Sequence, residues 1–206
     1  MKYIKNMTMI DEYITYQLEA EKKYGKDTIV FYENGSFYEI YGVDNEKERV
    51  GQPKRVSEIL NIAMTRKNKK ILENSRKNPL LVGVPVAHAE KHIKALITSG
   101  MTIVYVEQTT APPNPERRLT RVQSPSMYIA DEYKTVNNYV LSIYFEVMRN
   151  RLGKANLVAG LSAFDLTTGD GIFFQTQSLN NDFEVVYEDI FRFMESIDPK
   201  EVVINM

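Results

Sequence analysis

The feature that most constrains this chain is a run of aromatic and β-branched residues, Thr28–Tyr41, that the dipeptide Asn34-Gly35 divides in two. Residues of these types favour strands, because they fit the half-buried surface of a pleated sheet. Asn-Gly between two such runs is the strongest short-range hairpin signal. The sequence therefore predicts two antiparallel strands over residues 28–41, joined by a turn at Asn34-Gly35.

The second strand of this hairpin carries an unusual pair of side chains. Strand alternation places Phe37, Glu39 and Tyr41 on one face, and Tyr38 and Ile40 on the other. If Tyr38 and Ile40 join a core, the opposite face presents a ring and a carboxylate roughly 6–7 Å apart. The ring could simply pack under a helix, or it could wedge or stack against a nucleic-acid base whose edge the carboxylate hydrogen-bonds. Spacing alone leaves both interpretations open.

Composition narrows the class of protein. The 206 residues suffice for one large domain or two small ones, and 43% of them are hydrophobic, enough for a packed core. The absence of cysteine excludes disulfides, thiolate metal sites and cysteine nucleophiles. No apolar run approaches the ~18 residues of a membrane span, and no secretion signal opens the chain. We therefore expect an intracellular protein with no membrane association.

The charges are divided unevenly between the two parts of the chain. Residues 1–125 hold 20 Lys and Arg against 15 Asp and Glu, whereas residues 126–206 hold 6 against 12. This asymmetry predicts two modules, of which only the first suits a polyanion. Its basic residues concentrate in the segment 66–77, which we predict to be a surface loop. The candidate phosphate-binding residues are Arg66, Lys67, Lys69, Lys70, Arg76 and Lys77. A solvated charged surface is the alternative.

Local patterns predict the remaining elements of the first module. Thr8 caps a helix that Gly25 ends. Two short helices follow the hairpin within Val43–Leu60, and Pro53 opens the second of them. The later elements are a strand over Ile62–Thr65, a strand over Leu80–Val84, a helix over Ala89–Thr98, a strand over Met101–Val106 and an extended segment over Leu119–Met127.

Composition changes at residues 128–138, which we predict to be a linker. The second module is predicted to follow the order β-β-β-α-β. Its elements are Tyr139–Phe145, Leu157–Asp165, Gly171–Gln175, the helix Glu184–Ser196 and the strand Glu201–Asn205. Because this pattern stops abruptly, we expect the chain to be a fragment of a longer protein.

Two other groups of residues have side chains that can bind a metal ion. His88 and His92 have the i, i+4 spacing of helical metal ligands, but no third ligand accompanies them. Four acidic residues of the second module could gather around Mg²⁺ as in a nuclease: Asp165, Asp170, Glu184 and Asp189. No phosphate-binding glycine motif occurs. An RNase H-like metal-dependent nuclease fragment and a protein-interaction module anchored by the hairpin ring therefore remain alternatives.

The order of the motifs is more specific than any one of them. The segment Phe31–Tyr41 resembles the FYxxGDFYELF segment of MutS-type DNA mismatch-recognition proteins. Further landmarks of that family follow at compatible spacing. They are Leu60-Asn-Ile-Ala-Met-Thr-Arg66, Gly83-Val-Pro85, Leu96-Ile97 with Gly100, Val106-Glu-Gln108, and Arg121-Val-Gln-Ser-Pro125, which is similar to RxxTPGT.

The resemblance implies an α/β fold in two parts. Residues 1–127 would form a mixed-sheet mismatch-recognition domain, residues 128–138 a linker, and residues 139–206 the truncated start of an RNase H-like connector domain. The segments that carry the second resemblance are Gly160-Leu-Ser-Ala-Phe-Asp-Leu-Thr-Thr-Gly169 and Asp198-Pro-Lys-Glu-Val-Val203.

The same resemblance implies a function. Phe37 would stack on a mispaired base and Glu39 would hydrogen-bond it, in duplex DNA with mismatches or small loops. The fragment would have no catalytic residues, no cofactor and no metal of its own. ATP and Mg²⁺ would bind domains missing from it, and the whole protein would be an ATPase and a homodimer. Ser36 departs from the family's aspartate, and His88 is shifted by one position.

Overall fold

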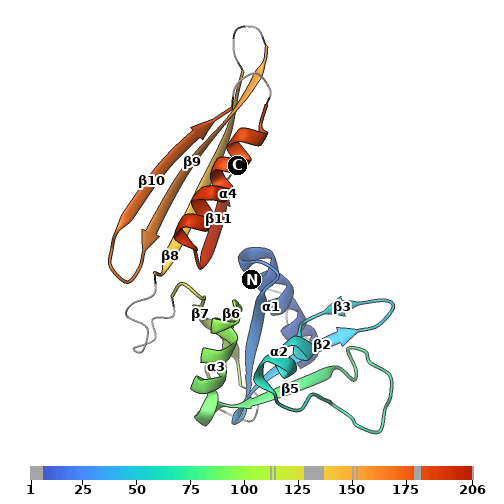
Figure 1. Ribbon diagram of the computed structural model, residues 1–206. Helices are drawn as coiled ribbons and strands as arrows, with labels where there is room; N and C mark the ends of the chain where they lie inside the picture. Colours follow the sequence, from blue (N-terminus) through green and yellow to red (C-terminus); the bar gives the residue numbers. More distant parts are fainter. Residues whose placement is uncertain are drawn as a thin grey trace. The chain divides into compact units, whose positions relative to one another are not determined.

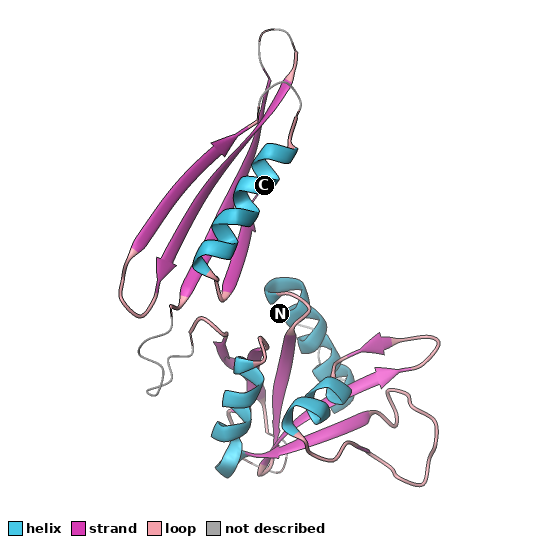
Figure 2. Ribbon diagram, in the orientation of Figure 1, coloured by secondary structure: helices cyan, strands magenta, loops and turns pink. Residues whose placement is uncertain are grey.

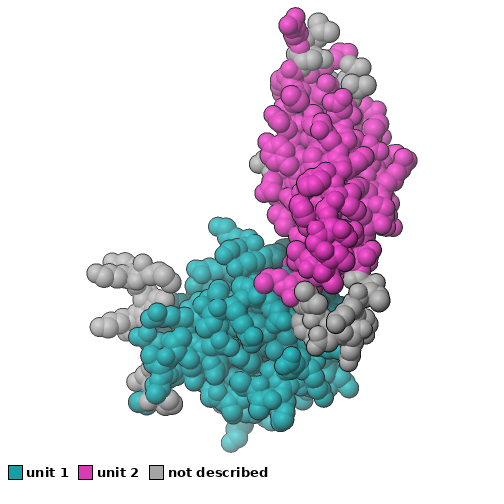
Figure 3. All heavy atoms as spheres, turned by 90° about the vertical axis from the view of Figure 1, so that its left-hand side faces the viewer, with its two compact units in different colours: residues 1–124 teal, residues 125–206 magenta. Residues whose placement is uncertain are grey.

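The computed structural model describes residues 7–111, 113, 115–127, 137–149, 151, 153–178 and 182–205. The chain divides into two compact units, residues 1–124 and 125–206 (Figure 3). Residues 128–136 of the expected linker lie outside the described residues. The domain bounds 1–127, 128–138 and 139–206 stay a prediction.

Helix α1 (Met9–Tyr24) begins and ends where the sequence predicts. The Thr8 hydroxyl oxygen accepts a hydrogen bond from the Asp11 backbone N–H at 3.2 Å, so it satisfies one of the free donors of the first turn. Gly25 follows the last turn with φ 94°, and its N–H donates to the Glu21 carbonyl. These end contacts are local, which is why the sequence alone predicts the bounds of this helix.

The first unit contains one mixed sheet, as predicted. Its neighbouring strands run in the order β4-β5-β2-β1-β6-β7, with β3 added to β2. Only β1 and β6 pair in parallel; the other neighbours are antiparallel (Figure 1). The strands are β1 (Thr28–Asn34), β2 (Phe37–Asp44), β3 (Arg49–Val50), β4 (Thr65–Arg66), β5 (Leu80–Pro85), β6 (Thr102–Gln108) and β7 (Arg117–Gln123).

Helices cover both faces of this sheet (Figure 2). On one face, Tyr13 and Ile14 of α1 pack with Val30, Tyr32 and Tyr41. The opposite face holds a cluster of three rings in mutual contact, Phe31, Tyr38 and Tyr105. The helices α2 (Pro53–Leu60) and α3 (Ala89–Thr98) contact strands of the sheet, and the short 3₁₀ helix η1 (Val86–His88) leads into α3.

Two predicted elements of this unit are wrong. The first of the two helices expected within Val43–Leu60 is absent, because β2 continues to Asp44 and pairs with β3. Val43 and Val50 are both buried against α1, and this burial favours the extended pair over a helix. The strand expected over Ile62–Thr65 is reduced to Thr65–Arg66, after a left-handed residue, Asn61, that ends α2. Pro53 opens α2 as predicted.

The second unit has the predicted order β-β-β-α-β. Its elements are β8 (Tyr139–Arg149), β9 (Ala155–Asp165), β10 (Gly171–Gln177), α4 (Glu184–Ile197) and β11 (Glu201–Asn205). The sheet order is β10-β9-β8-β11, in which β8, β9 and β10 are antiparallel and β11 is parallel to β8. Val186 and Ile190 of α4 pack on Leu141, Ile143 and Leu161. None of the helices in the described part of the chain combines the length and apolar character needed to cross a bilayer.

Candidate functional site

The predicted hairpin is present, but its turn is centred one residue later than expected. Asn34 pairs with Phe37 as the last residue of β1, so Gly35 and Ser36 form the turn. Gly35 has φ 62°, whereas Ser36 is not among the residues with positive φ. This pattern is typical of a II′ turn, in which only the first central residue needs positive φ. The Asn34 side chain is therefore available for a contact on the strand face.

Phe37 is the exposed ring of this hairpin. Its side chain is 44% exposed, whereas Tyr38 and Tyr41 on the same strand are buried. It pairs with Pro85 of β5, and its ring leans over Gly83, where a Cβ would lie 3.6 Å from Phe37 Cδ1. Helix α1 covers the other end of this strand face and leaves the turn end open.

Glu39 is half-buried beside this ring, on the same strand face. Its Oε2 atom accepts hydrogen bonds from Asn34 Nδ2 at 2.8 Å and from the Tyr41 hydroxyl. Tyr41 therefore shares the face as predicted, but it is buried, and its ring makes an edge contact with Tyr13. Burial and the nearby Glu39 carboxylate raise the pKa of the Tyr41 hydroxyl, so this group stays protonated and remains a donor.

Arg117 of β7 supports the turn end of the hairpin. Its Nε donates to the Glu33 carbonyl at 2.7 Å and its Nη2 to Asn34 Oδ1 at 3.4 Å. The guanidinium also lies 4.8 Å from the centre of the Tyr32 ring. The sequence pattern does not identify Asn34 as a partner of Glu39, because it places Asn34 in the turn. It also does not identify the hydroxyl group of Tyr41 as a donor, although strand alternation places Tyr41 near Glu39. No local signal could have found Arg117, which lies 83 residues from Asn34.

The basic loop lies at the far end of β5 from Phe37. Leu80, which follows the loop, pairs with Gly42, whereas Pro85 pairs with Phe37. Five residues of strand at about 3.3 Å each separate the two ends by roughly 17 Å. The structure therefore does not bring the loop residues and the hairpin ring into one cluster.

A buried asparagine shapes this loop. Asn78 is 2% exposed, and its Oδ1 accepts from the Asn68 backbone N–H at 2.7 Å. Its Nδ2 donates to the carbonyls of Ile71 and Glu73 at 2.9 and 3.0 Å. These contacts satisfy three backbone groups that a loop cannot pair within a sheet.

The six basic residues predicted to bind phosphate differ in their surroundings. The four lysines are exposed and form no ion pair with a described residue; they are Lys67, Lys69, Lys70 and Lys77. Arg66 is half-buried, and its Nε has no hydrogen-bond partner in the described part of the chain. Arg76 is engaged: its Nη1 lies 3.0 Å from Asp11 Oδ1, and its Nε lies 2.9 Å from Glu48 Oε2. Arg76 therefore ties the loop to the start of α1.

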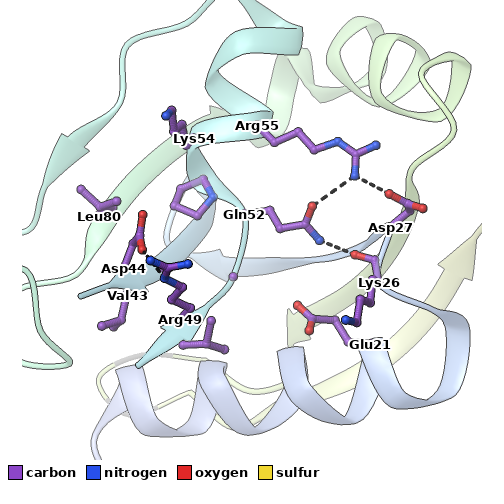
Figure 4. Close-up of a pocket in the computed structure, with 14 residues that line it drawn as sticks. Glu21, Lys26, Asp27, Val43, Asp44, Arg49, Gln52, Lys54, Arg55 and Leu80 are labelled. Atoms are coloured by element: carbon purple, nitrogen blue, oxygen red, sulfur yellow. Dashed lines mark hydrogen bonds and ion pairs between the residues drawn. The ribbon is translucent and has the colours of Figure 1, made fainter. Parts of the chain in front are cut away.

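A hollow of about 630 Å³ lies around the other end of β2, near Gly42–Asp44 (Figure 4). Charged side chains of both signs line it, and two pairs form across it: Arg55 with Asp27, and Arg49 with Asp44 at 3.3 Å. The Gln52 side chain donates to the Lys26 carbonyl and accepts from Arg55. Both arginines that line this hollow are therefore already paired with carboxylates.

Three of the four acidic residues predicted as possible Mg²⁺ ligands form hydrogen bonds with neighbouring groups, and the fourth is the first residue of a helix. Burial alone would raise the pKa of Asp165, but hydrogen bonds from the backbone N–H groups of Thr167 and Thr168 lower it. Asp170 and Asp189 accept from threonine hydroxyl groups, and Glu184 opens α4. The described residues contain no group of three or more His, Asp or Glu side chains placed to hold a metal. His88 and His92 therefore have no third ligand among the described residues.

Comparison with known proteins shows which family this chain resembles. The family model described as MutS domain I matches residues 14–132. A putative DNA mismatch repair mutS homologue of Acanthamoeba polyphaga mimivirus is 29% identical over 97% of this chain and 18% of its own length. The DNA mismatch repair protein MutS of Treponema denticola is 30% identical over 91% of this chain and 19% of its own. The DNA mismatch repair protein MutS of Borreliella burgdorferi is 29% identical over 98% of this chain and 20% of its own length.

The chain therefore spans about a fifth of the length of these relatives. The family model covers the hairpin, the basic loop and Arg117 together. Since this match extends over more than half of the residues, the chain belongs to the MutS family of DNA mismatch repair proteins.

Proposed function

We propose that this chain recognises mismatched base pairs, and that Phe37 and Glu39 carry out the recognition. Phe37 inserts at a mispaired step of duplex DNA and stacks on a base, and Glu39 accepts a hydrogen bond from that base. The observation that supports this role best is the exposure of Phe37, 44%, on a strand whose other rings are buried. An exposed ring on a strand that is paired with a neighbour on each side suits a wedge, because the paired backbone resists displacement when the ring meets the base stack.

Discrimination would come from the cost of deforming the DNA. Inserting an apolar side chain between base steps kinks the duplex and costs a few kcal/mol of unstacking. A mispaired step has weaker pairing and yields more cheaply than a matched one. Stacking of the base on Phe37 returns about 1–3 kcal/mol whichever base is present. The ring therefore selects steps that deform easily rather than a particular sequence.

The exposed lysines of the basic loop would contact phosphates away from the probed step. The length of β5 between the end of the loop and Phe37, roughly 17 Å, corresponds to about five steps of 3.4 Å along one DNA strand. Lys67, Lys69, Lys70 and Lys77 have no carboxylate partner in the described part of the chain, so their charge is available to phosphate. These contacts would position the DNA without reading its sequence.

The second unit would be the start of an RNase H-like connector domain. Its order β-β-β-α-β and its parallel β11–β8 pair support this assignment. Remaining MutS domains would supply ATP and Mg²⁺ binding, and the whole protein would be a homodimer. The role of this chain is then binding rather than catalysis.

Binding of matched and mismatched duplexes by the full-length protein tests the proposal. Phe37→Ala should lower the preference for the mismatched duplex by about 5- to 160-fold, because it removes the stacking free energy of one ring. Leu18→Ala is a matched control, since Leu18 is 48% exposed on the outer face of α1. An unchanged mismatch preference in Phe37→Ala would refute the role of the ring.

The same samples separate the two alternatives. Magnesium-dependent cleavage of the labelled duplex that is lost on changing Asp165 or Asp189 would favour a nuclease. Failure to bind either duplex at low salt would favour a protein-interaction module, because phosphate contacts are strongest there.

A further inference from the structure

The hydrogen bonds of Glu39 converge on one of its two carboxylate oxygens. Asn34 Nδ2 and the Tyr41 hydroxyl both donate to Oε2, and among the described residues no hydrogen bond reaches Oε1. An ionised carboxylate has acceptor sites on both oxygens. One oxygen is thus used to fix the side chain, and the other is left with free acceptor sites.

Arg117 and Glu39 require the same orientation of the Asn34 amide. A guanidinium has only donors, so the amide atom that faces it must be the oxygen. Asn34 Oδ1 accepts from Arg117 Nη2 at 3.4 Å, and Nδ2 is thereby directed toward Glu39. Arg117 is itself held by its bond to the Glu33 carbonyl, and Asn34 is the last paired residue of β1. The donor that reaches Glu39 is consequently placed before any ligand arrives.

Tyr41 is fixed in a different way. It is 2% exposed and lies under α1, where its ring contacts the ring of Tyr13 at 5.2 Å between centres. Tyr41 also follows Glu39 by two positions on the same strand face, so its hydroxyl is carried by the same backbone as the carboxylate that it binds. Asn34 of the neighbouring strand and the core residue Tyr41 therefore both restrain the Glu39 side chain.

We propose that Asn34 and Tyr41 are positioning residues that hold Glu39 with Oε1 directed outward to accept a hydrogen bond from the displaced base. The inference rests on the proposed function of Glu39 and adds the means by which its geometry is set. An unrestrained glutamate samples many rotamers, and fixing it on binding costs conformational entropy. Holding it beforehand lets the base bond contribute to affinity for the mismatched duplex without that cost.

The experiment measures Kd for a duplex with one mismatch and for its matched counterpart, using the full-length protein. Asn34→Ala and Tyr41→Phe should each lower the mismatch preference about 3- to 10-fold, the effect of one lost hydrogen bond, and leave the matched Kd unchanged. Asn34→Asp should lower it further, because a carboxylate would then face Glu39. Tyr41→Phe deletes only the hydroxyl oxygen and keeps the packed ring, so it remains informative if Asn34 variants unfold.

Two control variants match these changes. Tyr38→Phe removes a hydroxyl from the opposite strand face, where it donates to Glu107 at 2.8 Å. Ser36→Ala alters the turn beside Asn34, at a side chain with no hydrogen bond to a described residue. Both should retain the wild-type preference.

The decisive arm repeats the substitutions in a Glu39→Ala background. If Asn34 and Tyr41 act through Glu39, neither should lower the preference any further there, whereas a general structural role would still lower it. An equal loss in both backgrounds overturns the inference, and so does a wild-type preference in Glu39→Ala. If Phe37→Ala loses the preference while Asn34→Ala and Tyr41→Phe keep it, the inference fails and the proposed function stands. If Phe37→Ala keeps it, the proposed function itself fails.

Discussion

The ring of Phe37 lies over Gly83 on the neighbouring strand, at a point where a Cβ on Gly83 would be 3.6 Å from Phe37 Cδ1. This distance is an ordinary van der Waals contact, so a methyl group at position 83 fits against the ring, whereas a longer side chain that extends toward Phe37 would displace it. The direction of the Phe37 ring therefore depends on the small size of the residue at position 83.

Changing Gly83 should therefore move the ring in proportion to the size of the new side chain. Gly83→Ala should keep the mismatch preference, since its methyl group fits beside Phe37. Gly83→Leu should lower the preference without unfolding the protein, because Gly83 is exposed and has no positive φ. Duplex binding together with thermal unfolding checks both variants. A wild-type preference in Gly83→Leu would show that the orientation of the ring does not matter.

The loop lysines should act through charge alone. Lys69→Ala and Lys70→Ala should weaken binding of matched and mismatched duplexes equally, and each should reduce the slope of log K against log salt by about 1. The measurement is a salt titration of both duplexes, with Lys22→Ala of α1 as the control. An unchanged slope would indicate that the loop is solvated surface.

Arg76→Ala should affect stability rather than DNA binding, because Arg76 is already paired with Asp11 and Glu48. Since these side chains are partly exposed, the loss in free energy of unfolding should be at most about 1 kcal/mol at pH 7. The salt slope for DNA binding should remain that of the wild type. A slope reduced by about 1 would instead place Arg76 on a phosphate.

The contribution of Arg76 should also depend on pH. Hydrogen bonds from Thr8 and Arg76 lower the pKa of Asp11, and hydrogen bonds from Arg76 lower that of Glu48. A carboxylate whose pKa is lowered on folding adds stability above its unfolded value, and this stability is lost as the pH falls through the folded value. The difference between wild type and Arg76→Ala should thus be constant from pH 7 to about 5, begin to fall as the pH approaches the ordinary carboxyl pKa of about 4, and decrease further as the pH falls through the lower pKa values of the folded state. Denaturant unfolding at several pH values measures it; a difference that does not decrease at all between pH 5 and pH 2 would contradict the ion pairs.

Asn78→Ala should release the basic loop. The change removes three hydrogen bonds of a buried side chain, an effect of about 2–3 kcal/mol on the local structure. Trypsin should then cleave at Lys69 and Lys70 faster than in the wild type, because the loop opens more often. Affinity should fall equally for both duplexes. Wild-type resistance to trypsin would show that Asn78 does not organise the loop.

The sequence by itself determined the elements whose signals are local. Thr8 and Gly25 bound α1, Pro53 opens α2, and the alternation in residues 28–41 gives the hairpin and places Phe37 and Glu39 on one strand face. Caps, turns and strand periodicity depend on neighbours a few residues away, so they can be read without the fold. The order β-β-β-α-β of the second unit follows for the same reason.

Only the tertiary structure decided how these elements meet. Val43 and Asp44 extend β2 instead of forming a helix, because pairing with Arg49–Val50 buries Val43 under α1. Asn34 holds Glu39 rather than serving the turn, in an orientation that Arg117, 83 positions away, also requires. The basic loop lies at the opposite end of β5 from the ring. Strand pairing and long-range hydrogen bonds depend on which surfaces are buried together, and no local pattern in the chain specifies that.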